Sequence, residues 1–171
     1  MYYRTRTYLA GDWDNDKDVV EQLRKWNDSK KWSIDFTDAH DLMSARDCSL
    51  NCTIKESLRK RMLHSKRFVL VISRTTKSRA AGSCIYCKSY DAFNGNCHKG
   101  YSVSFDSYIE YECKKALEMG LKIIVIHKGA CVIRSHCPKV LQNEGIHVSA
   151  YASYFGEWNY AEIRDAFRAT E

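Results

Sequence analysis

Two short runs of apolar, largely β-branched residues stand out along the chain, Phe68–Ile72 and Lys122–Ile126. A continuous apolar run of this length is typical of a strand that is covered on both faces, as in a parallel sheet. Two segments of similar length are weaker strand candidates, Thr5–Ala10 and Trp32–Phe36. Ile146–Tyr151 is a fifth candidate, and we expect it at an edge of the sheet.

Apolar residues at helical spacing lie between and after these strands. The four stripes are Val19, Leu23 and Trp26; Ile54, Leu58 and Met62; Ile109, Cys113, Ala116 and Leu117; and Ile163, Ala166 and Phe167. Asp14 and Asp16 precede the first stripe and are its candidate N-caps. Thr53 and Glu56 have the spacing of a capping box for the second stripe, and the alternative is a helix that starts one turn earlier.

Strands and helices therefore alternate, which predicts an α/β fold with right-handed crossovers. We expect a flavodoxin-like, doubly wound, parallel five-stranded sheet of order 2-1-3-4-5, in a single domain over residues 1–171. Residues 74–106 show no clear periodicity and form an insertion between the third strand and the third helix. In such sheets ligands bind beyond the carboxyl ends of the strands, at the switch point between strands 1 and 3.

Hydropathy and charge indicate where in the cell the protein is found and which classes of partner it binds. No apolar run approaches the roughly 20 residues of a membrane span, and the first residues lack the apolar stretch of a signal peptide, so we expect a cytoplasmic protein with no membrane partner. The net charge is +6, but the basic residues are spread along the chain. The Arg59–Arg61 cluster is interpreted as a solvated helix face, and the pattern does not favour a nucleic-acid partner.

One helix carries a candidate catalytic pair. Tyr108 and Glu112 are four residues apart, which places an aromatic ring and a carboxylate on one face near the start of the third stripe. A ring can stack on a base, and a carboxylate can stabilise an oxocarbenium-like transition state. The alternative is that Glu112 is a surface acid paired with Lys114 or Lys115, and spacing alone leaves both interpretations open.

The order of these segments resembles a known family. Phe68–Ser73, then Tyr108–Glu112, then Gly120–Ile126 look like the core of TIR and TIR-like domains, and in particular of the bacterial TIR-like family that includes the Thoeris B proteins of anti-phage defence. The resemblance runs from about Arg4 to about Lys128. This chain departs from the family's Trp-x-x-x-Glu element by having Tyr108 in place of tryptophan.

The resemblance implies an activity and a set of site residues. Glu112 falls at the catalytic glutamate of NAD⁺-cleaving TIR domains, so NAD⁺ is the implied substrate, and nicotinamide and an ADP-ribose-derived signal are the implied products. That signal, cyclic or conjugated, would reach a downstream effector by diffusion. The implied substrate-binding residues are Tyr108, Ala10, Asp12, Asp38, His40 and Ser73.

Two other functions stay open. One is a non-enzymatic TIR-like module that self-associates through the loop at Asp38–Asp41 and through helix faces. The other is a nucleoside deoxyribosyltransferase-like reaction, which also uses a carboxylate on a flavodoxin-like fold. The sequence contains none of four motifs that mark other enzyme classes, namely the P-loop, G-x-G-x-x-G, G-x-S-x-G and H-E-x-x-H.

The insertion carries a cluster of candidate metal ligands. Cys84 and Cys87 form a C-x-x-C pair, and Cys97 with His98 could complete a structural Zn²⁺ site. Unpaired thiols and a disulfide or redox role are the alternatives. Because the insertion precedes Tyr108, we expect it to overhang the pocket as a lid or a partner surface. Outside the insertion, Cys113 and Cys131 are expected to be small buried hydrophobes and Cys48 and Cys52 to be structural.

Overall fold

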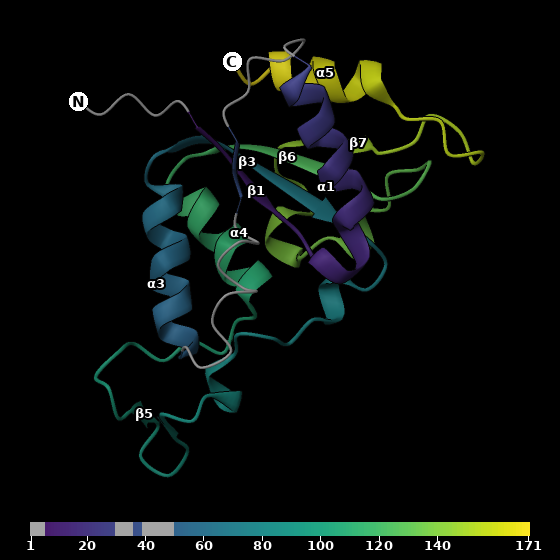
Figure 1. Cartoon of the computed structure of the whole chain (residues 1–171). Helices are drawn as coiled ribbons and strands as arrows, with labels where there is room; N and C mark the ends of the chain where they lie inside the picture. The colour runs from purple at the N-terminus through teal and green to yellow at the C-terminus, as the bar shows by residue number, and fades with distance from the viewer. Residues whose placement is uncertain (1–5, 30–35, 39–49) are drawn as a thin grey trace.

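A parallel sheet forms the centre of the computed structural model, which describes residues 6–29, 36–38 and 50–171 (Figure 1). Its strands lie in the order β2-β1-β3-β6-β7, and each neighbouring pair is parallel. They are β1 (Arg6–Ala10), β2 (Phe36–Asp38), β3 (Ser65–Ile72), β6 (Lys122–His127) and β7 (Ile146–Ser149). The expected α/β class with a parallel sheet is confirmed. The chain leaves β1 for β2 on one side and returns to β3 on the other, which makes the β1–β3 pair the switch point.

Helices cover both faces of this sheet (Figure 1). Residues of α1 and α5 pack with one set of strand side chains, including Leu9 and Val69, and residues of α3 and α4 pack with the other, including Tyr8 and Leu70. The alternation of neighbours along a strand explains why each strand feeds two cores. The helices are α1 (Trp13–Asp28), α3 (Asn51–Met62), α4 (Tyr108–Glu118) and α5 (Tyr160–Arg168).

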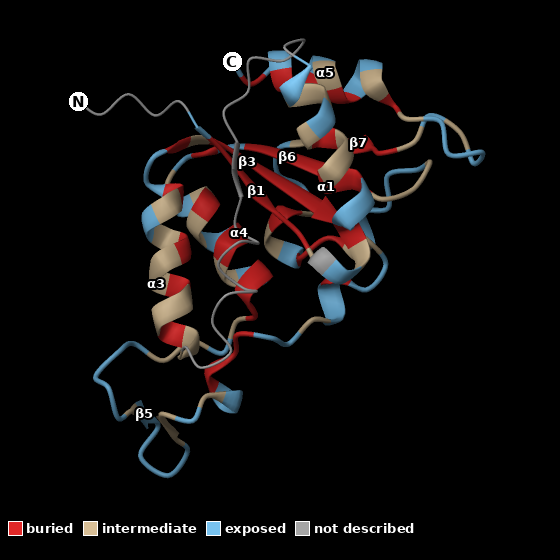
Figure 2. Ribbon diagram, viewed as in Figure 1, coloured by how far each residue is buried: buried red, intermediate tan, exposed pale blue. Residues whose placement is uncertain are grey.

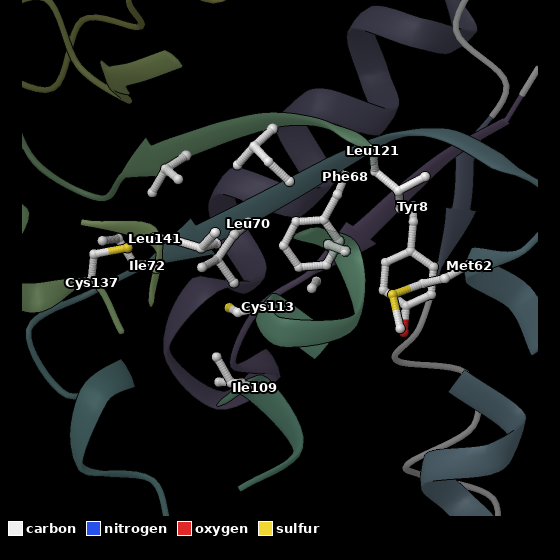
Figure 3. Packing of buried hydrophobic residues seen from close by; sticks show 14 of the residues in the cluster. Tyr8, Met62, Phe68, Leu70, Ile72, Ile109, Cys113, Leu121, Cys137 and Leu141 are labelled. Atoms are coloured by element: carbon white, nitrogen blue, oxygen red, sulfur yellow. The ribbon is translucent and has the colours of Figure 1, made fainter. Parts of the chain in front are cut away.

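The buried residues concentrate in the strands and on the inward faces of the helices (Figure 2). β3 is buried along nearly all of its length, which is why its Phe68–Ile72 segment is continuously apolar rather than alternating. On the α3–α4 side, Tyr8 and Phe68 lie at paired positions of β1 and β3, with ring centroids 5.7 Å apart (Figure 3). Met62 of α3 belongs to the same cluster.

Two helix starts differ from the expectation. Asp12, rather than Asp14 or Asp16, is the N-cap of α1: its backbone is extended and its side chain accepts from the Asp14 N–H. The capping box at Thr53 does not form, because α3 has the alternative, earlier start: it begins at Asn51, and Thr53 lies inside its first turn. The Asn51 side chain instead donates to the Ser83 carbonyl oxygen at 2.9 Å, which ties this helix start to the insertion.

The insertion is folded but projects from the body beyond one end of α3 (Figure 1). It contains the short helices η1 (Thr76–Ser78) and η2 (Cys84–Tyr86) and an antiparallel hairpin of β4 (Tyr90–Asp91) and β5 (Asn96–Cys97). The C-terminal end of the insertion is anchored by Lys55 of α3. The Lys55 Nζ donates to the Asp106 carbonyl oxygen at 2.7 Å and to the carbonyl and hydroxyl oxygens of Ser104. The absence of periodicity is thus explained by turns and a two-stranded hairpin with little core of its own.

The expectations for single cysteines and for the last strand are confirmed in part. Cys113 is buried, as expected, but the expectation for Cys131 is wrong: it is exposed, and its sulfur lies 3.3 Å from the Tyr154 hydroxyl. Cys131 follows β6 in an irregular loop rather than continuing a buried element. Cys48 lies outside the described residues. β7 is an edge strand, as expected. In the part of the chain that the structure describes, no helix is both long and apolar enough to cross a membrane.

Candidate functional site

The start of α4 is fixed by its cap, and this orients the helix that carries Glu112. The Ser107 hydroxyl accepts from the Glu110 N–H at 3.2 Å, and the Glu110 carboxylate accepts from the Ser107 N–H at 3.0 Å. This reciprocal capping box satisfies two backbone donors that a helix start would otherwise leave free. Glu110 is therefore a capping residue, while Lys114 pairs with Asp106 at 2.6 Å.

Glu112 lies on the buried face of α4, with only 4% of its surface exposed. Its Oε1 accepts a hydrogen bond from the hydroxyl of Tyr8, which is fully buried at the middle of β1. Lys115, one of its alternative surface partners, pairs with Glu118 instead. The surface-acid interpretation of Glu112 is wrong, because the helix turns this carboxyl group toward the sheet.

The surroundings of Glu112 tune its protonation. Burial raises the pKa of Glu112 to about 7, while the hydrogen bond from Tyr8 opposes that rise. Burial and the neighbouring Glu112 carboxylate both raise the pKa of Tyr8 well above its ordinary value, so the phenol stays protonated and remains the donor. A carboxyl group that titrates near neutral pH is suited to hold a proton or to stabilise a developing cation.

Tyr108 begins α4 one turn before Glu112 and is held from two sides. Its hydroxyl donates to the Asn51 side-chain oxygen at 2.9 Å. One face of its ring packs against Gly82, where an added Cβ would lie 2.6 Å from the ring. Tyr108 therefore joins α3, α4 and the insertion, and one face of its ring is already covered.

Polar side chains gather where β1 and β3 end. The Asn15 amide donates to the Asp12 carboxylate at 2.8 Å and to the Thr75 hydroxyl at 3.2 Å. The Thr75 hydroxyl in turn lies 3.4 Å from that of Ser73. Asp12 also forms an ion pair with Arg79 at 2.5 Å. Two of the expected site residues, Asp12 and Ser73, thus share one hydrogen-bonded network at the switch point.

Asp16 adds a buried carboxyl group to this network. Its Oδ2 accepts from the Asp12 N–H at 2.9 Å, and its Oδ1 has no hydrogen-bond partner among the described residues. Burial raises the pKa of Asp16 to about 6. The sequence pattern suggested Asp16 only as a cap, because four acidic residues alternate in this stretch and nothing in the pattern tells them apart.

Of the other expected substrate-binding residues, two lie at the ends of strands and one lies outside the described residues. Ala10 is the last residue of β1 and is buried in the α3–α4 core. Asp38 ends β2, where it pairs in register with Leu9. His40 lies outside the described residues. The structure therefore brings Asp12 and Ser73 together, while Glu112 is linked to β1 through Tyr8.

The expected zinc ligands lie in the insertion but do not form a cluster. Cys84 is buried in η2 and its sulfur accepts from the Ser104 N–H at 3.3 Å; Cys97 is on β5. Over the ranges that the structure describes, no three histidine, cysteine, aspartate or glutamate side chains are arranged to hold a metal ion. As they stand, Cys84, Cys87, Cys97 and His98 do not fit a zinc ion, and the site stays a prediction.

Two histidines that the sequence left unpaired meet at the edge of the sheet. His127 Nε2 lies 2.9 Å from His147 Nδ1. The Ile133 N–H donates to His127 Nδ1 at 3.2 Å, so His127 carries its proton on Nε2 and donates to His147. His147 then donates from Nε2 to the carbonyl oxygens of Leu141 and Glu144. Both rings must be neutral for this chain of donors to form.

We expect His127 to titrate far below an ordinary histidine. Burial, followed by the charge of His147, lowers the pKa of His127 to about 4. Neutral His127 therefore stabilises the folded state fully above pH 6.5, the pKa of the unfolded chain. This stabilisation is lost as the pH falls toward 4, because the unfolded chain binds the proton first. NMR titration of the ring protons should give a midpoint near 4 in the folded protein and near 6.5 in urea; a folded midpoint of 6 or more would contradict the hydrogen-bonded chain.

A cavity of about 610 Å³ lies between α3, α4 and the end of the insertion. Its wall is mostly charged and aromatic, and Glu112 is not part of it. The lining residues include Lys55, Glu56 and Arg59 of α3; Tyr101, Ser104 and Asp106 of the insertion; and Tyr111, Lys114, Lys115 and Glu118 of α4. The sequence signals for it were the Arg59–Arg61 cluster, which was interpreted as a solvated helix face, and Lys114 and Lys115, which were considered only as surface partners of Glu112.

Comparison with known proteins confirms the family resemblance. Residues 7–81 match the family model described as Thoeris protein ThsB, TIR-like domain. The match covers β1 to the first part of the insertion and ends before α4, so Glu112 lies outside it. No curated protein matches the chain.

Proposed function

We propose that this TIR-like protein breaks the nicotinamide–ribose bond of NAD⁺, with Glu112 as the catalytic carboxylate, and serves anti-phage defence. The observation that carries the proposal is the buried Glu112 carboxyl group, hydrogen-bonded by Tyr8, with a pKa of about 7. The match to a Thoeris TIR-like domain supports the defence role.

Cleavage of the nicotinamide–ribose bond is favoured by a carboxylate beside the ribose. When the bond between ribose C1′ and the pyridinium nitrogen breaks, its electron pair leaves with nicotinamide, and positive charge develops on the ribose ring. Ionised Glu112 would stabilise that charge in a low-dielectric site, where such an interaction is strong. Water, or a nucleophile of the same nucleotide, then bonds to C1′ and loses a proton, giving ADP-ribose or a cyclic product.

The burial of Glu112 bears on when the reaction occurs. With 4% of its surface exposed, the carboxyl group meets NAD⁺ only after neighbouring side chains move. We therefore expect slow nicotinamide release by the resting protein and faster release in an activated state, such as after addition of a phage-infected lysate. Conformational steps of this kind commonly limit turnover.

The test is nicotinamide release from NAD⁺, followed by mass spectrometry of the nucleotide product. Glu112→Gln should reduce release by about 100-fold or more, since removing one group that stabilises transition-state charge costs that much. Glu110→Gln is the matched control, because a glutamine can keep the capping box, and it should stay within about 2-fold of the wild type.

Other outcomes would favour the alternatives. Full activity in the Glu112→Gln variant would remove Glu112 from the mechanism. Exchange of bases on deoxynucleosides without NAD⁺ cleavage would favour deoxyribosyl transfer. Concentration-dependent assembly with no nucleotide turnover in either state would favour a non-enzymatic module.

A further inference from the structure

The cavity between α3 and α4 has more positive than negative charge on its wall. Four basic and three acidic side chains line it. Three of the basic residues form ion pairs across or along the helices, Arg59 with Glu56 at 2.8 Å, Lys114 with Asp106 at 2.6 Å and Lys115 with Glu118 at 2.5 Å. The fourth, Lys55, is held by neutral oxygens of Ser104 and Asp106, and among the described residues no carboxylate lies within ion-pair distance of it.

The ion pairs of Arg59 and Lys115 are weak enough for an anion to compete with them. Glu56 and Glu118 have 40% and 59% of their side-chain surface exposed, and exposed pairs of this kind are weak because water and salt screen them. Arg59 of α3 and Lys115 of α4 both line the cavity, and the positive charge of Arg59 opposes the rise that Glu118 causes in the pKa of Lys115. An anion placed between them would relieve their repulsion.

An aromatic ring of the cavity wall lies close to two ammonium groups. The Tyr111 ring centroid is 5.5 Å from Lys55 Nζ and 5.8 Å from Lys115 Nζ. A second aromatic residue of the wall, Tyr101, is about half exposed. A flat ring next to cations is the combination that recognises a base together with a phosphate.

We propose that this cavity is a second ligand site, which binds a nucleotide with its base against Tyr111 and its phosphate between Arg59 and Lys115. The volume of about 610 Å³ lies within the range of small-molecule sites. Lys55 contributes its charge rather than a hydrogen bond, because its three N–H groups are already taken. Glu112 takes no part in this site, so the inference stands apart from the proposed reaction.

Equilibrium dialysis with AMP tests the inference, because AMP has no nicotinamide bond to break. We expect saturable binding of AMP, with adenosine and inorganic phosphate each at least about 10-fold weaker. The Arg59→Gln/Lys115→Gln double variant should weaken AMP binding by about 10-fold or more, and so should Tyr111→Leu. Lys60→Gln, a neighbour on α3 that does not line the cavity, should bind AMP as the wild type does.

The outcomes separate this site from the Glu112 site. Glu112→Gln should leave AMP binding unchanged whether or not it abolishes nicotinamide release. AMP binding that Glu112→Gln abolishes and the double variant leaves intact would overturn the inference, as would the lack of saturable binding by a folded wild-type protein. Because none of the exchanged side chains is fully buried, circular dichroism should show both cavity variants folded.

Discussion

Glutamine in place of Glu112 should stabilise the protein at alkaline pH: relative to the wild type, the variant is expected to gain about 3 kcal/mol of unfolding free energy between pH 4.5 and pH 8. The folded state holds the Glu112 proton up to about pH 7, whereas the unfolded chain releases it near 4.5. The folded protein thus binds more protons over that interval, and its stability falls as the pH rises. The difference between pKa values of about 7 and 4.5, at about 1.4 kcal/mol for each pKa unit, corresponds to about 3.5 kcal/mol, of which about 3 kcal/mol falls between pH 4.5 and pH 8.

Urea unfolding at pH 4.5 and at pH 8 measures this difference. Asp16 and His127 also titrate in the folded protein, but they are present in both proteins, so their effects cancel in the comparison. Glu110→Gln should show no comparable gain, because Glu110 is a capping residue near the surface. A variant whose stability relative to wild type stays constant with pH would show that Glu112 is not held protonated by burial. Loss of activity together with gain of stability is the pattern expected of a residue kept for catalysis.

Alanine in place of Gly82 should destabilise the protein by about 3 kcal/mol. The backbone of Gly82 has a φ of +98°, and an added Cβ would lie 2.6 Å from the Tyr108 ring. The left-handed backbone alone costs about 1–2 kcal/mol for a residue with a Cβ. Displacing the buried Tyr108 ring, and with it the hydrogen bond to Asn51, adds an overpacking cost of about 1–3 kcal/mol.

Gly95→Ala is the control that isolates the contact. Gly95 also has a positive φ, of +67°, but no atom lies within 4 Å of an added Cβ. Its substitution should therefore cost only the backbone term of about 1 kcal/mol. Thermal or urea unfolding of the two variants gives the comparison, and equal losses would mean that the Tyr108 ring moves aside freely.

The buried strands were the best predicted part of the fold. Phe68–Ile72 and Lys122–Ile126 lie within β3 and β6, because a strand covered on both faces leaves a continuous apolar run that nothing else in this chain resembles. The caps were predicted less well. Several acidic residues near α1 could each accept from a helix N–H, and only the backbone conformation at Asp12 decides which one does.

The site was predicted in part, for a similar reason. Helical spacing placed Glu112 beside the apolar stripe of α4, and the structure buries it there. Its partner Tyr8 is 104 residues away, and no local pattern connects a strand tyrosine with a distant helix. The His127–His147 pair and the cavity beside Tyr111 arise in the same way, from neighbours in space that the sequence separates.

The two anchors of the insertion have a consequence for how freely it can vary. Asn51 holds the chain at Ser83, and Lys55 holds it again at Ser104 and Asp106. Both anchoring side chains lie on the first turns of α3. The stretch from Ser83 to Ser104, which contains the hairpin, is therefore a loop whose two ends are held close together by one helix. The entropy of closing such a loop grows only with the logarithm of its length, by roughly 0.6 kcal/mol for each doubling. The hairpin could therefore be shortened, extended or exchanged at little cost to the α/β body, provided that the two anchoring side chains are kept.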